Sequence, residues 1–217
     1  MRSAIFFAPY SLSNYTTSNK KLYSLIKMEA KLGNIMRTCE LKKHGFYYKR
    51  IKQMLDSGEI EQVRRGFYRL QDEMSLSDVP VLQKLFPDGV ICMESVLDFY
   101  GYTDRVPSEW HLAVDSRSAR ARFKIDFPIV KPHFIKTDRY TIGITDAEID
   151  GTRIKIYDKE RTICDILLHR NKIDAEVFNT AIKRYAADNG KNIHNLIKYS
   201  QILHVEKKVR EVLGIWL

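Results

Sequence analysis

The sequence is poor in cysteine and has no long apolar run. Its three cysteines, Cys39, Cys92 and Cys164, form no CxxC pair and no cluster with histidine at metal-ligand spacing. We therefore expect reduced thiols in a cytoplasmic protein, each buried as a small apolar side chain among apolar neighbours. No segment approaches the roughly 18 consecutive apolar residues of a membrane span, and the N-terminal IFFA is too short for a secretory signal.

The usual catalytic patterns are also missing. The sequence has no phosphate-binding loop, no HExxH and no Ser/His/Asp order. The histidines are scattered without ligand spacing, at positions 44, 111, 133, 169, 194 and 204. We therefore predict no catalytic residues, no metal site and no cofactor.

Positive charge is concentrated in one quarter of the chain. The formal net charge is +9, but residues 20–70 hold thirteen Lys/Arg and five Asp/Glu, which leaves the other 166 residues close to neutral. Such asymmetry predicts a basic N-terminal unit that binds a polyanion and a second unit that does not.

The basic unit has the pattern of a winged helix-turn-helix. Apolar spacing predicts a first helix over 20–32, a short second helix from an N-cap at Thr38 to Gly45, and a third over 46–56. Alternation over 60–70 with a reversal at Gly66 predicts a β-hairpin, the wing. The expected core positions of this unit are Tyr47, Ile51, Leu55, Val63 and Phe67.

A basic third helix in this fold is suited to the major groove of double-stranded DNA. Candidates for base or sugar contact are Tyr48, Lys49, Lys52 and Gln53. Candidates for phosphate contact lie on the second helix, the third helix and the wing: Arg37, Lys42, Lys43, Arg50, Arg64, Arg65 and Arg69. Winged helices also mediate protein contacts, but a surplus of eight charges over 51 residues favours phosphate neutralisation.

From residue 73 the pattern becomes mixed, which predicts an α+β unit that ends in a helical bundle. We expect a helix over 93–100, a strand over 110–115, an extended segment over 123–135, and a hairpin that turns at Asp150-Gly151. Asp158, Asp174 and Lys191-Asn192 precede the closing helices, and the two aspartates suit N-cap positions.

One polar cluster could be taken for a metal-dependent nuclease site. Asp158, Glu160, Arg161, Asp165 and His169 surround a single predicted helix. The structural interpretation is stronger, because Asp158 can cap the helix and Arg161 can pair with Asp165 at i, i+4. One helix seldom assembles a complete active site.

The chain resembles a known family in three segments. TCELKKHGFYYKRIKQMLDSGEIEQVRRGFYRL resembles the N-terminal winged helix of the AbiEi-type antitoxins, whose wing reads G-E/x-I/L-x-x-V-x-R-G-x-Y. VICMESVLDFYGYTDRVPSEWHLAV is similar to the opening of the family's second domain. IKIYDKERTICDILL resembles its D-x-x-R-T-[IL]-x-D segment through Asp158, Arg161, Thr162 and Asp165. Residues 1–19 have no counterpart, and Phe46-Tyr47-Tyr48 replaces the frequent Ser/Thr cap of helix three.

The resemblance implies three segments: an N-terminal extension (1–19), a DNA-binding winged helix (20–72) and an α+β antitoxin domain (73–217). It implies an autorepressor that binds inverted repeats in its own promoter and neutralises a nucleotidyltransferase-like toxin encoded nearby. It further implies a type IV system for abortive infection against phage, in which the two proteins need not form a stable complex. A regulator without a toxin and a nucleic-acid-processing enzyme remain as alternatives.

Overall fold

The computed structural model describes residues 35–70 and 77–214. The part of the N-terminal unit that is described, residues 35–70, contains two helices and a three-stranded antiparallel sheet in the order β1-β3-β2. Its elements are β1 (Ile35–Arg37), α2 (Thr38–Lys43), α3 (Tyr48–Asp56), β2 (Ile60–Arg64) and β3 (Phe67–Leu70). The predicted first helix, 20–32, lies outside the described residues. The described elements have the order of a winged helix-turn-helix, as the sequence predicts.

Glycines occupy both turns of this unit, and the strand β1 differs from the expectation for residues 35–37. Gly45, between α2 and α3, and Gly66, between β2 and β3, have φ of +85° and +83°, which favours glycine. Residues 35–37 pair with β3 as a strand, although we expected them to lead directly into the second helix. Thr38 is therefore the first helical residue and Arg37 the N-cap, which corrects the predicted cap.

The core of the N-terminal unit differs in part from the predicted one. It contains six buried side chains: Met36, Leu41, Phe46, Ile51, Met54 and Ile60. Ile51 is confirmed, and Leu55 packs against the cluster while half-buried. Tyr47 is 66% exposed, so its assignment to the core was wrong. As the N-cap of α3 it has an extended backbone, so helical spacing does not apply to it.

The second unit has a mixed five-stranded sheet in the order β6-β5-β4-β8-β7. Its strands are β4 (Val90–Ile91), β5 (Trp110–Asp115), β6 (Val130–Ile135), β7 (Ile144–Ile149) and β8 (Thr152–Tyr157). Its helices are α4 (Val79–Leu85), α5 (Met93–Phe99), η3 (Arg120–Phe123), α6 (Thr137–Tyr140), α7 (Lys159–Leu168), η4 (Arg170–Lys172), α8 (Ala175–Ala187), α9 (Ile193–Ile202) and α10 (Glu206–Leu213). None of these helices is long and apolar enough to cross a membrane.

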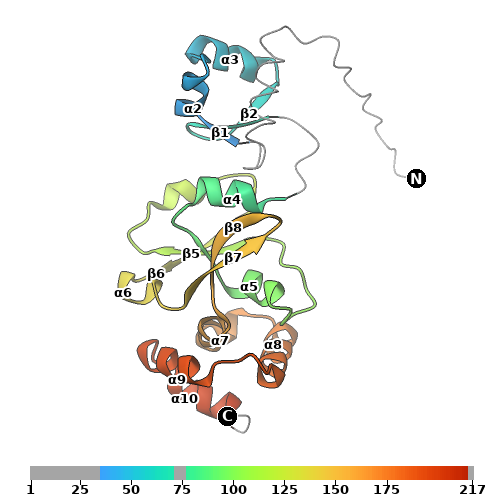
Figure 1. Cartoon of the computed structure of the whole chain (residues 1–217), viewed down its shortest axis with the longest axis vertical. Helices are drawn as coiled ribbons and strands as arrows, with labels where there is room; N and C mark the ends of the chain where they lie inside the picture. Colours follow the sequence, from blue (N-terminus) through green and yellow to red (C-terminus); the bar gives the residue numbers. More distant parts are fainter. Residues whose placement is uncertain (1–34, 71–76, 215–217) are drawn as a thin grey trace, which may run out of the picture.

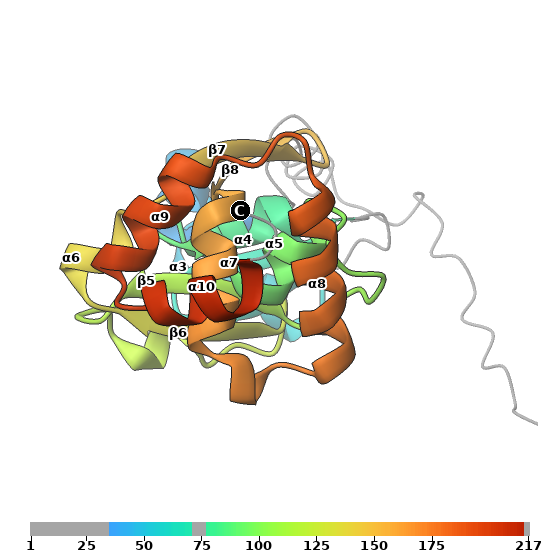
Figure 2. The same cartoon turned by 90° about the horizontal axis from the view of Figure 1, so that it is seen from below.

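Two cores lie on opposite faces of this sheet. Residues that alternate along β4 and β5 enter different clusters: Val90 and Ala113 pack with α5 and the C-terminal helices, whereas Ile91 and Leu112 pack with α4. Figure 1 shows α4 on one side of the sheet and α5 and α7 on the other, and Figure 2 shows α7–α10 from their outer side. The fold class predicted from the sequence, α+β with a closing helical bundle, is confirmed.

Local signals in this unit are also confirmed. Asp150 and Gly151 form the hairpin turn, both with positive φ. The Asp158 carboxylate accepts the backbone N–H of Arg161, and that of Asp174 accepts those of Glu176 and Val177. Cys92 and Cys164 are buried as predicted, but Cys39 is exposed on α2. The burial of Cys39 was predicted wrongly because apolar neighbours in sequence do not fix which side of a helix faces the core.

Candidate nucleic-acid interface

Helix α3 turns a polar, basic face to solvent. Ile51 and Met54 bury its inner side, which leaves Tyr48, Lys49, Lys52 and Gln53 exposed and Arg50 half-buried. In Figure 1, α3 lies at the end of the N-terminal unit that points away from the second unit. The four residues predicted to contact bases or sugars are therefore together on one accessible helix face.

Further cations extend this face. Lys42 and Lys43 are exposed in the last turn of α2, and Arg65 is exposed in the wing turn. In the described part of the chain, neither they nor Lys49 and Lys52 are held in an ion pair. Uncompensated charge at an exposed surface favours a polyanion, because binding releases its condensed counterions. We call these exposed residues of α2, α3 and the wing turn the outer basic face: Lys42, Lys43, Tyr48, Lys49, Lys52, Gln53 and Arg65.

Arg64, next to Arg65, lies elsewhere. Its guanidinium stacks over Phe67 and Phe86, 4.4 and 5.5 Å from the ring centroids. It also donates hydrogen bonds to the backbone carbonyls of Leu85 (3.2 Å) and Arg122 (3.4 Å). Burial, followed by the nearby charge of Arg122, lowers the pKa of Arg64. The structure thus places Arg64 between the two units.

Two other predicted arginines are also engaged. Arg37 Nη2 lies 3.5 Å from the carbonyl oxygen of Lys84 and its guanidinium 5.4 Å from the Phe67 ring. Arg69 pairs with Glu61 (2.5 Å) and lies 4.5 Å from the ring of Phe127. Arg37, Arg64 and Arg69, which were predicted to contact DNA, are therefore engaged by these groups of the protein.

The wing joins the two units because its apolar side faces the second core. Val63 and Phe67 pack against the cluster that contains Val79, Leu85 and Phe86, not against the core of their own unit. Ile60, on the other side of the hairpin, packs within the N-terminal unit. The pairing of β2 with β3 shifts register between Gln62 and Arg64, at the point where the hairpin changes from packing on its own unit to packing on the second unit.

Sequence reasoning missed one exposed aromatic residue. Tyr47 immediately precedes α3 and is 66% exposed, beside Tyr48 at 77%. Adjacent exposed tyrosines offer rings and hydroxyls at the start of α3. Gly45 could have indicated the exposure of Tyr47. This glycine ends the second helix, and Tyr47, two residues later, then belongs to the cap of α3 and not to its buried face.

The polar cluster on α7 has a structural role. Arg161 is 1% exposed, and its Nε lies 3.0 and 3.1 Å from the two carboxylate oxygens of Asp165. Its Nη1 donates to the carbonyls of Arg139 (2.6 Å) and Ile142 (2.9 Å). Gly143 is required beside it, since a Cβ there would lie 2.5 Å from that of Arg161. The predicted cap and ion pair are confirmed, and they attach α7 to the loop that precedes β7.

The described residues form an α+β protein whose N-terminal unit is consistent with a winged helix and exposes a basic face of α3. Residues 24–71 match the family described as "Transcriptional regulator, AbiEi antitoxin", which confirms the resemblance seen in the sequence. The fold is similar to the crystal structure of the RV2827C protein from Mycobacterium tuberculosis, with a TM-score of 0.65 and 12% identity over 91% of this chain and 80% of that one. No curated protein matches the chain.

Proposed function

We propose that this protein is a cytoplasmic DNA-binding antitoxin that represses its own operon. The observation that carries the DNA-binding part is the outer basic face, where lysines without ion-pair partners in the described structure surround an exposed helix. The matched family supports the regulator and antitoxin roles in general.

In this proposal, different residues of the outer basic face contact different parts of the DNA. Lys42, Lys43 and Arg65 hold phosphates, and α3 enters the major groove with Tyr48, Lys49, Lys52 and Gln53. Arg50 remains a phosphate candidate at the flank of the same helix. Arg37, Arg64 and Arg69 are not assigned to DNA, because rings, carbonyls or a carboxylate of the protein already hold them.

We assign DNA binding to residues 20–72 and antitoxicity to residues 73–217, with 1–19 as an extension. The proposed partner of the second unit is a nucleotidyltransferase-like toxin encoded nearby, with or without a stable complex. A reading frame of that class beside this one, and rescue of its toxicity by the second unit expressed with it, would support the assignment. Failure of the intact chain to rescue would instead favour a regulator that has no toxin.

The central experiment is a gel shift on the protein's own upstream region and on random DNA over a range of salt concentrations. In a Lys49→Ala, Lys52→Ala double variant we expect weaker binding to both DNAs. If each lysine neutralises one phosphate, the slope of log K against log salt should fall by about two.

The matched control removes two exposed lysines from the second unit, Lys183→Ala with Lys198→Ala. Both lie outside the outer basic face, on α8 and α9, so the total charge changes equally while the face stays intact. If both double variants weaken DNA binding equally, the affinity depends only on the protein's net charge. That result would contradict the assignment of α3.

A further inference from the structure

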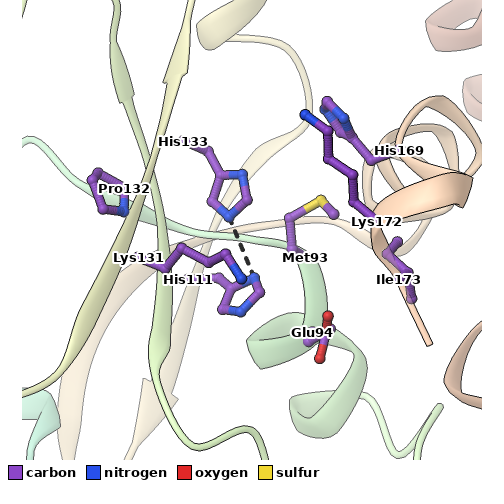
Figure 3. A pocket seen from close by; sticks show the side chains of 9 residues that line it. All are labelled: Met93, Glu94, His111, Lys131, Pro132, His133, His169, Lys172 and Ile173. Carbon is purple, nitrogen blue, oxygen red and sulfur yellow. Dashed lines mark hydrogen bonds between the residues drawn. The ribbon is translucent and has the colours of Figure 1, made fainter.

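A pocket of about 220 Å³ lies in the second unit, far along the chain from the outer basic face. It opens between β5 and β6, the start of α5, and the segment between α7 and α8 that includes η4. Figure 3 shows the side chains that line it. Its polar lining consists of three histidines, two lysines and one carboxylate: His111, His133, His169, Lys131, Lys172 and Glu94.

Strand register brings two of the histidines together. β5 and β6 run parallel, with Ala113 opposite His133 and His111 opposite Lys131. His111 Nδ1 and His133 Nε2 consequently lie 3.3 Å apart. Burial lowers the pKa of each imidazole to about 4, so both rings are neutral at neutral pH and one donates its N–H to the other.

Glu109 indicates which ring is the donor. Its carboxylate lies 3.8 Å from the outer nitrogen of His111, Nε2, and this favours the proton on that atom. His111 Nδ1 then accepts from His133 Nε2, and His133 Nδ1 is left with a lone pair. In Figure 3 His133 lies between His111 and the side formed by His169 and Lys172. The pocket therefore offers a hydrogen-bond acceptor at His133.

The two lysines lie on different sides of the pocket, Lys131 beside His111 and Lys172 beside His169 (Figure 3). Lys131 is held by Glu109 at 2.8 Å, whereas Lys172 has no carboxylate partner among the described residues. The pKa of His169 is lowered by burial and then by the charges of Lys172 and Lys208. The uncompensated charge of Lys172 raises the positive potential on its side of the pocket. Glu94 lies on the other side of the pocket in Figure 3, away from Lys172.

A metal does not suit these residues. Within residues 35–70 and 77–214, no group of three His, Cys, Asp or Glu side chains is arranged to hold a metal ion. An anion suits them better, because Lys172 supplies a donor and an uncompensated charge. A ligand that also carries a proton to donate would satisfy His133 Nδ1 at the same time.

We propose that this pocket binds inorganic phosphate, which retains a P–OH at neutral pH. Lys172 binds the anionic oxygens, and His133 Nδ1 accepts the hydrogen bond of the P–OH. Sulfate has a similar shape and charge but no proton at neutral pH, so the site selects phosphate over sulfate. The pocket holds the phosphate group itself, since its volume is below the roughly 300 Å³ typical of drug-sized ligands.

The test is calorimetric titration of the full chain with inorganic phosphate, with adenosine 5′-monophosphate and with sulfate, at constant ionic strength. We expect saturable phosphate binding with a Kd of about 1 mM or tighter, and sulfate binding about tenfold weaker. The nucleotide's phosphate has lost its last proton at neutral pH, so it should bind as weakly as sulfate. Absence of saturation with inorganic phosphate, or equal binding of sulfate or of the nucleotide, would overturn the proposal.

Variants locate the site. Lys172→Ala changes an exposed side chain and should weaken phosphate binding about tenfold or more, because a hydrogen bond to a charged group is lost. Lys183→Ala on α8, an exposed lysine outside the pocket, is the control and should leave it unchanged. His133→Phe should abolish the preference for phosphate over sulfate. Unchanged phosphate binding in Lys172→Ala would contradict the proposal even if the histidine variant does not fold.

A spectroscopic measurement separates this site from the outer basic face. Phosphate should shift the imidazole NMR signals of His111, His133 and His169, and leave those of the exposed His194 and His204 in place. The Lys49→Ala, Lys52→Ala variant should bind phosphate like the parent protein. If that variant loses phosphate binding, the ion occupies the DNA-binding face and the pocket proposal is wrong.

Discussion

The two units use charged side chains in opposite ways. On the outer basic face, Lys42, Lys43, Lys49 and Lys52 are exposed and have no ion-pair partner in the described structure. In the second unit, Arg161 is 1% exposed and bonds to Asp165 and two backbone carbonyls. Charge left in solvent is available to a partner, whereas charge inside the protein is committed to the fold.

At the junction between the units, arginines stack on rings: Arg64 over Phe67 and Phe86, and Arg122 over Phe86 while it pairs with Asp88. Lys84 also lies there, in an ion pair with Glu40 (3.0 Å). A planar guanidinium can stack and donate in fixed directions at once, whereas an ammonium is a strongly hydrated point charge. Composition counts arginine and lysine alike as basic. It therefore does not distinguish side chains that hold the fold together from side chains that remain available to a ligand.

The largest effect is expected from Asp165→Ala, which leaves Arg161 buried without its carboxylate. The free energy of unfolding should fall by about 3–5 kcal/mol, measured by denaturation with urea. Asp146→Ala, which breaks the exposed pair with Arg153, is the matched control and should cost no more than about 1 kcal/mol. Similar losses in the two variants would show that burial does not distinguish the pairs.

A second prediction concerns pH. Burial lowers the pKa of His111 from 6.5 to about 4, so the unfolded chain binds a proton there that the folded chain excludes. Stability is therefore lost as the pH falls from about 6.5 to 4, by roughly 3 kcal/mol for this residue. His111→Gln should flatten the decline of the urea midpoint over that range, and exposed His194→Gln should not. A decline of unchanged slope in His111→Gln would refute the assignment.

On the outer basic face, Gln53→Ala tests whether α3 recognises bases. It should cost roughly 1–3 kcal/mol on the preferred promoter site and little on random DNA. Gel-shift titrations on the two DNAs at one salt concentration measure the difference. Equal losses on both would show that Gln53 does not contact bases.

The smallest expected effects compare two neighbours in the wing. Arg65→Ala should weaken binding to both DNAs and lower the salt slope by about one, as for one lost phosphate contact. Arg64→Ala should leave that slope unchanged and instead lower the free energy of unfolding by about 1 kcal/mol, because it removes hydrogen bonds at the junction. A reduced salt slope in Arg64→Ala would show that Arg64 leaves Phe86 to reach DNA.

Much of the second unit could be predicted because its signals are local. The caps at Asp158 and Asp174, the pair between Arg161 and Asp165 and the turn at Asp150-Gly151 each involve residues within four positions of one another. The helix geometry or turn type that a few residues adopt determines such contacts. The basic, exposed face of α3 followed in the same way from helical spacing.

Contacts between segments that are distant in the sequence could not be predicted from sequence spacing. The strand at 35–37 forms only because β3, thirty residues later, supplies its partner, and Tyr47 was misplaced because its cap conformation breaks the helical period. His111 and His133 are 22 positions apart and meet only through the register of β5 and β6. Sequence spacing alone carries no information about that register.

The sequence by itself determined where the charge is, that α3 and α7 are helices, and that Asp158 and Asp174 are N-caps, because these depend on composition and neighbouring backbone geometry. Tertiary structure alone decided that Arg65 faces solvent while Arg64 and Phe67 join the second unit, and that a pocket forms around the paired histidines. Both outcomes depend on which surfaces meet when separate elements pack, and residues adjacent in the chain can then have different partners.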